Sequence, residues 1–92
     1  MELRRSRLFL QSPLNDRLQQ FILQSRQKAG MSQRELASKL GVRQTMVARI
    51  EQGNRSVDLG EFVAICRLLG ENPSEVLTSL LSHDPSAADA KE

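Results

Sequence analysis

The feature that most constrains this chain is a 20-residue segment, residues 33–52, in which a glycine and a small residue stand at fixed places among apolar ones. Ala37 is small enough for a second helix to pass close over it, and Gly41 supplies the positive φ that a tight turn needs. The apolar positions share a helical spacing on either side of that turn: Leu36, Leu40, Val42, Val47 and Ile50. A chance match at all of these positions is expected less than roughly once in 10,000 sequences. The spacing predicts two short helices that cross steeply, a helix-turn-helix. The alternative is a helical hairpin that serves packing alone.

Start and stop signals divide the rest of the chain into further helices. Ser12 and Pro13 form an N-cap followed by a proline at the first helical position, and Gly30 ends this first helix. Later starts share one pattern, a capping residue followed three residues later by Glu: Ser32 and Glu35, Asp58 and Glu61, Asn72 and Glu75. We therefore expect an all-α domain of five short helices, with the third at about 44–52 and the fifth ending near Leu81.

The helical rhythm also predicts which residues face the core. In the first helix the apolar positions are Leu14, Leu18, Phe21, Ile22 and Ala29. In the fourth helix they are Leu59, Phe62, Val63, Cys66 and Leu69. The expected organisation is an N-terminal arm over residues 1–11, a domain over 12–81 and a short disordered tail over 82–92, which is rich in Ser, Ala and Asp.

Composition excludes several classes of protein. A chain of 92 residues has room for one domain. Its single cysteine, Cys66, allows no intrachain disulfide and no thiolate-rich zinc site. The only histidine, His83, lies in the tail, where a metal site is not expected. No apolar stretch approaches the roughly 20 residues that a membrane span needs, and no signal peptide is recognisable. We expect a cytoplasmic protein without metal or cofactor.

The distribution of charge points to a polyanion as partner. Residues 1–56 carry eleven Lys and Arg against four Asp and Glu, whereas residues 57–92 carry two against seven. A basic half joined to an acidic half suggests that one face meets nucleic acid, although a chance excess of solvated charge would look the same. The only aromatic residues are three Phe, too few for the stacking platforms that bind single strands. Duplex DNA is therefore the expected nucleic acid.

From about residue 18 to 77 the sequence resembles the Xre family, the phage-repressor and Cro-like helix-turn-helix domains. The matching text comprises Arg26 to Gln33 (RQKAGMSQ), Glu35 to Ala37 (ELA), Leu40 to Val42 (LGV) and Val47 to Gly53 (VARIEQG). The resemblance implies a five-helix, lambda-repressor-like fold. It also implies operator binding as a homodimer.

The resemblance assigns roles residue by residue. The positions from which the family reads base edges are Gln44, Thr45 and Arg49, with Ala48 beside them. The positions where the family touches phosphate are Gln33, Asn54 and Arg55. Arg26 and Glu51 match a pair that forms a partly buried salt bridge between the first and third helices.

Side-chain chemistry supports these roles independently. Gln can make two hydrogen bonds to adenine, Arg can make two to guanine, and the methyl of Thr can touch thymine. Arg43 stands where the family usually caps the third helix with Ser or Thr; Arg cannot cap, so we expect it to reach a phosphate or a guanine. For Arg49, base reading and a phosphate or intrachain role both stay open. Met46 replaces a smaller residue and either packs inward or touches the sugar-phosphate edge.

These observations together predict a sequence-specific transcriptional regulator. We expect a repressor that binds double-stranded DNA as a dimer on a palindromic operator. No nucleophile–base pair or Gly-rich phosphate loop is present, so the sequence favours no enzyme, and Cys66 reads as a small core residue. The alternative is an antitoxin or adaptor whose main partner is a protein, such as a toxin; the basic third helix favours DNA.

Overall fold

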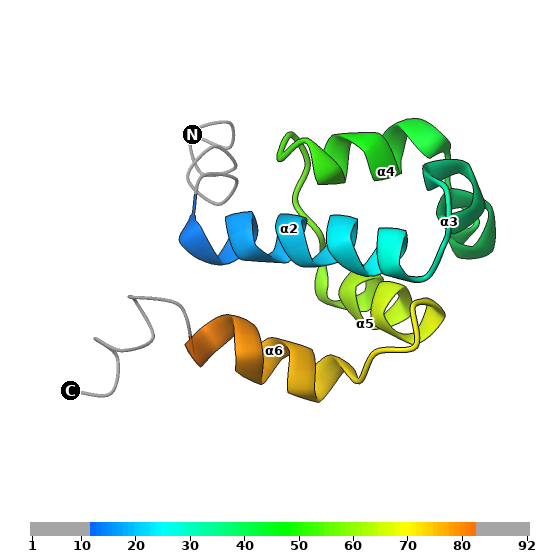
Figure 1. Cartoon of the computed structure of the whole chain (residues 1–92). Coiled ribbons are helices and arrows are strands. Elements are labelled where there is room, and N and C mark those ends of the chain that lie inside the picture. Colours follow the sequence, from blue (N-terminus) through cyan, green and yellow to red (C-terminus); the bar gives the residue numbers. More distant parts are fainter. Residues whose placement is uncertain (1–11, 83–92) are drawn as a thin grey trace.

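The structure, a computed structural model, describes residues 12–82 and contains five α-helices in that range. They are labelled as in Figure 1: α2 (Pro13–Lys28), α3 (Gln33–Leu40), α4 (Gln44–Glu51), α5 (Leu59–Leu68) and α6 (Pro73–Ser82). Residues 12–82 contain no strand, which confirms the expected all-α class. Ser82, which we expected in the tail, is instead the last residue of α6. The arm (1–11) and the rest of the tail lie outside the described residues.

The predicted caps begin the helices where expected. The Ser12 hydroxyl accepts a hydrogen bond from the backbone N–H of Asn15 at 3.1 Å. Before α3, the hydroxyl of Ser32 accepts from the N–H of Glu35, whose carboxylate accepts in turn from the N–H of Ser32. Asp58 and Glu61 form the same reciprocal box at the start of α5. Each cap satisfies helix N–H groups that have no partner inside the helix.

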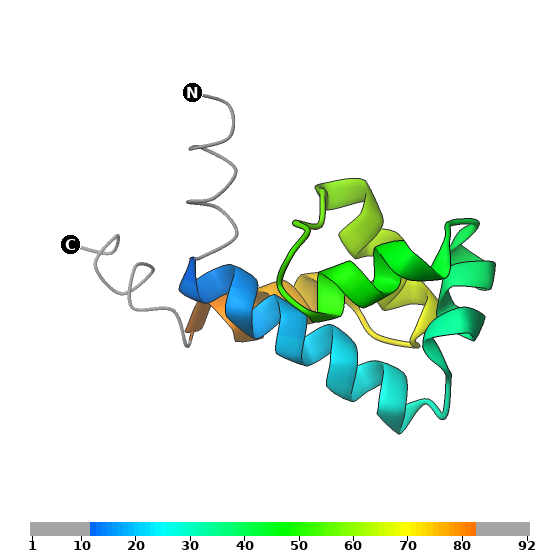
Figure 2. The same ribbon diagram turned by 90° about the horizontal axis from the view of Figure 1, so that it is seen from above.

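The long helix α2 is the axis on which the other elements are arranged. Figure 1 shows α4 along one side of α2 and α6 along the other, and the view from above in Figure 2 agrees. α3 packs against α4 and α5, at the end of the molecule where α2 finishes. This arrangement leaves the side of α4 that faces away from α2 open to a partner.

The helix-turn-helix has the geometry that its spacing predicts. Gly41 caps α3 with φ 74°, in the left-handed region. Four of the segment's apolar residues are almost completely buried: Leu36, Ala37, Val47 and Ile50. Leu40 and Val42 are half-buried against the same cluster. The core under the turn therefore fixes α4 against both α3 and α2.

Two predicted core positions were wrong. Leu59 is 73% exposed, because it is the first residue of α5 and the buried face of that helix begins one turn later at Phe62. Ala29 is exposed because α2 ends one residue earlier and Ala29 is only its C-cap. Conversely Ile65, absent from the expected core, is 2% exposed and lies among the most buried side chains. In the described residues no helix is both long and apolar enough to cross a membrane.

Candidate nucleic-acid interface

The outward face of α4 gathers the residues expected to read bases. Gln44, Thr45 and Arg49 are exposed and Ala48 is half-buried, whereas Val47 and Ile50 on the opposite side are buried. Successive residues of a helix are about 100° apart, so Gln44, Thr45 and Arg49 lie within roughly 140° of the circumference and share one face. The structure therefore presents an amide, a hydroxyl and a guanidinium together, without a carboxylate among them.

The only acid of α4 lies beneath the helix, in a network with two other elements. Arg26 on α2 donates from Nε to Oε2 of Glu51 at 2.6 Å and from Nη2 to Oε1 at 3.0 Å. The side chains of Arg26 and Glu51 are only 11% and 4% exposed. The hydrogen bond to Glu51 raises the pKa of Arg26, and desolvation opposes it. The structure thus brings together the two residues expected to form the interhelix salt bridge.

Gln33, the first residue of α3, joins the same network. Its side-chain amide donates to Oε1 of Glu51 at 2.9 Å. Arg26 also donates to the carbonyl oxygen of Met31, just before α3. These bonds tie the start of α3 to the end of α4. A phosphate contact from Gln33 would have to use the second amide N–H or the backbone, because one N–H is committed to Glu51.

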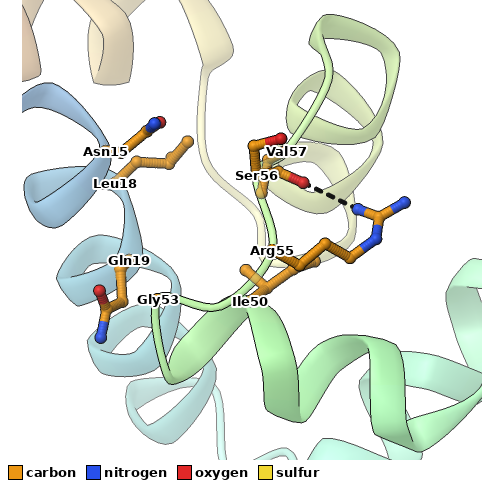
Figure 3. A pocket seen from close by; sticks show the side chains of 8 residues that line it. All are labelled: Asn15, Leu18, Gln19, Ile50, Gly53, Arg55, Ser56 and Val57. Atoms are coloured by element: carbon orange, nitrogen blue, oxygen red, sulfur yellow. Dashed lines mark hydrogen bonds between the residues drawn. The ribbon is translucent and has the colours of Figure 1, made fainter. Parts of the chain in front are cut away.

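The loop after α4 holds two more of the expected phosphate residues, Asn54 and Arg55, and both side chains have internal partners. Arg55 donates to both carboxylate oxygens of Glu61 at 2.9 and 3.0 Å, and also to the carbonyl of Ser56. Figure 3 shows this last bond. The pairing lowers the pKa of Glu61 and raises that of Arg55, chiefly through the hydrogen bonds between them. Asn54 is exposed, with its amide 3.4 Å from Oε1 of Gln52.

Sequence reasoning missed the pairing of Arg55 with Glu61. The spacing marked Glu61 as a capping residue, and Glu61 does accept from the N–H of Asp58 at 3.0 Å. The same carboxylate also accepts from Arg55, across a loop whose path the sequence did not reveal. Arg55 is thus held close to the start of α5, with its side chain 37% exposed.

A hollow of about 230 Å³ lies beside the exposed face of α4, between this helix and the loop that follows it. Five residues line it, three of them arginines: Arg43, Arg49, Arg55, Thr45 and Met46. Arg43 occupies the N-cap position of α4 without a side-chain cap hydrogen bond. Met46 both packs on the core and lines this hollow. Three arginine side chains line this concave surface, and that of Arg55 is already paired with Glu61. Arginine is well suited to bind an anion such as a DNA phosphate.

Little in the described part of the chain suggests other chemistry. Between residues 12 and 82 there is no group of three or more His, Cys, Asp or Glu side chains that could hold a metal ion. Cys66 is fully buried in the core, and burial raises the pKa of its thiol, which disfavours the reactive thiolate. His83 lies outside the described residues. The exposed face of α4 therefore remains the candidate interface.

Comparison with known proteins identifies the family. A helix-turn-helix family model, HTH_3, matches residues 22–76. Among solved structures, an XRE-family like protein from Pseudomonas syringae pv. tomato str. DC3000 is 35% identical in sequence and superposes with a TM-score of 0.72. That match covers 78% of this chain and 88% of the other. No curated protein matches the sequence. With the family model spanning more than half of its length, the chain belongs to the XRE family of helix-turn-helix DNA-binding transcription regulators.

Proposed function

We propose that this protein recognises a specific duplex DNA sequence through α4 and acts in the cytoplasm as a transcriptional repressor. The observation that carries the proposal is the division of α4 into two faces. Gln44, Thr45 and Arg49 are exposed, whereas the single acid of the helix, Glu51, is buried and neutralised by Arg26. A helix with this outward face can enter a major groove without repelling the phosphates that line it.

In this proposal the residues divide by what they contact. Gln44 and Thr45 read base edges, with Ala48 leaving room beside them for close approach. Phosphate contacts fix the register of the protein on the duplex. They come from Gln33 at the start of α3, from Arg43 just before α4, and from Asn54 and Arg55 just after α4. Arg49 fits both roles. It is exposed on the same face as Gln44 and Thr45, and it also lines the hollow with Arg43 and Arg55.

We further propose that the working unit is a symmetric homodimer on a palindromic operator. One reading helix of eight residues is about 12 Å long and reaches only a few base pairs. Two copies related by a two-fold axis place their reading helices one DNA turn apart, about 34 Å. Leu77 and Leu81 on α6 remain 39% and 38% exposed, and Leu59 is more exposed still. These leucines lie on elements other than α4, so they can meet a second copy while α4 meets DNA.

Selection of bound sequences from a random duplex pool, at about 0.1 M salt, tests the proposed recognition. We expect one enriched motif with two inverted half-sites. A pool that stays random while the protein is folded would contradict sequence-specific binding. A single, unrepeated half-site would contradict the dimer but leave recognition by α4 intact.

A further inference from the structure

The junction between the middle of α2 and the end of α4 contains a contact that neither the capping signals nor the helix-turn-helix spacing predicts. Gln19 on α2 donates from its side-chain amide to the backbone carbonyl of Glu51 at 2.6 Å. In Figure 3 Gln19 lies beside the turn at Gly53, just after the end of α4. The side chains around this junction leave a cavity of only about 10 Å³, room for one water at most.

The end of α4 explains what this hydrogen bond accomplishes. The N–H of Asn54 bonds to the carbonyl of Arg49, and the N–H of Gly53 bonds to the carbonyl of Ile50. These two bonds form a Schellman ending, in which the glycine takes a positive φ, here 79°. Neither bond uses the carbonyl of Glu51, so this carbonyl receives no hydrogen bond from a backbone N–H at the end of α4. Gln19 supplies a donor from another helix.

Other helices of this chain end in the same motif without such a donor. At the end of α3, the N–H of Gly41 bonds to Ser38 and that of Val42 to Ala37. At the end of α5, the N–H of Gly70 bonds to the carbonyl of Arg67. The Schellman bonds by themselves therefore suffice to end a helix here. The contact from Gln19 adds a link between α4 and α2.

Among the glycines with positive φ in residues 12–82, only Gly53 has a neighbouring atom close to where a Cβ would lie. A Cβ built on Gly53 would lie 2.8 Å from Oε1 of Gln19, closer than real Cβ atoms come to another atom. Gly41 and Gly70 have similar positive φ angles, 74° and 76°, but nothing lies within 4 Å of a Cβ there. A side chain at residue 53 would therefore have to displace the end of Gln19, beside the turn that leads directly to Asn54 and Arg55.

We propose that Gln19 is a positioning residue for DNA binding. It fixes the end of the reading helix against α2 and so sets where Asn54 and Arg55 leave that helix toward the phosphates. The inference rests on the proposed function, because it concerns how the phosphate-contacting loop is held. Its structural half, the coupling between Gln19 and Gly53, holds independently of any DNA.

The structural half is tested without DNA. Gly53→Ala should lower the folding equilibrium constant more than Gly70→Ala does, by about two- to tenfold, because the new methyl displaces Gln19 from Glu51. In a Gln19→Ala background this excess should disappear. Equal costs at Gly53 and Gly70, or an excess that persists without Gln19, would overturn the coupling.

Amide hydrogen exchange locates the effect. Gln19→Met keeps the size of the side chain but removes its donor, and Gln20→Met is a matched control because Gln20 is exposed on the α6 side of α2. Exchange at the Asn54 N–H should accelerate in Gln19→Met relative to exchange at the Val42 N–H, which makes the same bond at the end of α3. Equal changes at both amides would mean that Gln19 supports only overall stability.

DNA binding tests the functional half, at a temperature where every variant is fully folded. Gln19→Met should weaken binding to all duplexes alike, by about two- to tenfold, and flatten the salt dependence, with sequence preference unchanged. Gln20→Met should bind like the parent protein. If the parent binds DNA and Gln19→Met binds equally well, Gln19 does not position the loop. If the parent does not bind DNA, the proposed function itself fails.

Discussion

At the scale of single residues, the buried network of Arg26, Glu51 and Gln33 has the largest expected energetic effect. The carboxylate of Glu51 is 4% exposed and accepts three hydrogen bonds from these partners. Removing one partner of such a pair leaves a charge in the protein interior without compensation, whereas replacing both by apolar groups removes the problem. Because it is buried in this network, Glu51 puts no free carboxylate on the exposed face of α4, the face proposed to meet DNA.

This network gives a prediction for a double-mutant cycle. Arg26→Met and Glu51→Leu should each lower the free energy of unfolding by about 3–5 kcal/mol, and the double variant should cost much less than the sum. Lys28→Met, at an exposed site on the same helix, is the control and should change little. Urea titration measures all four. Strict additivity would show that the two charges are not coupled, and if a single variant is unfolded, the double variant should regain the fold.

How much the sequence reveals at this scale depends on distance along the chain. Reciprocal caps such as that of Ser32 and Glu35 are visible because their members stand three residues apart. The pairing of Arg26 with Glu51 was accessible only through a resemblance, since 25 residues separate them. The contacts of Gln19 with Glu51 and of Arg55 with Glu61 had no signal, because they depend on how helices pack and on the path of a loop.

At the scale of elements, the starts and stops of helices are the most predictable feature. A Ser, Asp or Asn cap starts a helix and a glycine ends it, each through hydrogen bonds that span only a few residues. The local sequence is therefore enough to predict where a helix begins and ends. Burial is less predictable at helix ends. Leu59 has the spacing of a core residue but lies on the first turn of α5, where no neighbouring element covers it.

The unusual cap of α4 gives a prediction at this scale. Arg43 has the extended backbone of an N-cap, φ −78° and ψ 148°, but makes no capping bond. Arg43→Ser should raise the free energy of unfolding by about 1 kcal/mol, because a Ser hydroxyl can accept from the first turn of the helix. The same change should weaken binding to all duplexes and lower the salt slope by about one unit, because a phosphate contact is lost.

Arg43→Ala separates the two effects. This change removes the guanidinium without adding a cap. It should therefore weaken DNA binding as much as Arg43→Ser does, but it should not raise the free energy of unfolding. Thermal unfolding and DNA titration at several salt concentrations measure both. Two variants of equal stability would show that the backbone at residue 43 does not favour a cap. Undiminished DNA binding by both would remove Arg43 from the phosphate contacts.

At the scale of the whole molecule, the large exposed leucines lie on α5 and α6 and not on α4. Figure 1 shows α4 and α6 on opposite sides of α2. Leu59 and Leu77 line one apolar hollow of about 240 Å³ with residues from the start of α2, including Leu14. The last helix contains four large apolar residues, Val76, Leu77, Leu80 and Leu81, and only the packing shows that Leu77 and Leu81 are the ones left uncovered.

The homodimer can be tested on this surface. Leu77→Lys should shift the protein toward monomer in light scattering, whereas Thr78→Lys, at the next exposed position of α6, should not. If Leu77→Lys remains dimeric, deletion of residues 1–11 tests the arm: a monomer would place the interface there. A parent protein that is monomeric both alone and on its DNA site would contradict the dimer.

The most direct measurement is the affinity of Gln44→Ala for the selected site and for a panel of its single-base-pair variants. If α4 reads sequence, Gln44→Ala should lose about 1–3 kcal/mol on the parent site and stop discriminating at one base pair of each half-site, while keeping preferences elsewhere. Gln24→Ala, at an exposed glutamine on the α6 side of α2, should match the parent protein on the whole panel. An even loss across all sites, or no loss, would contradict base reading by α4.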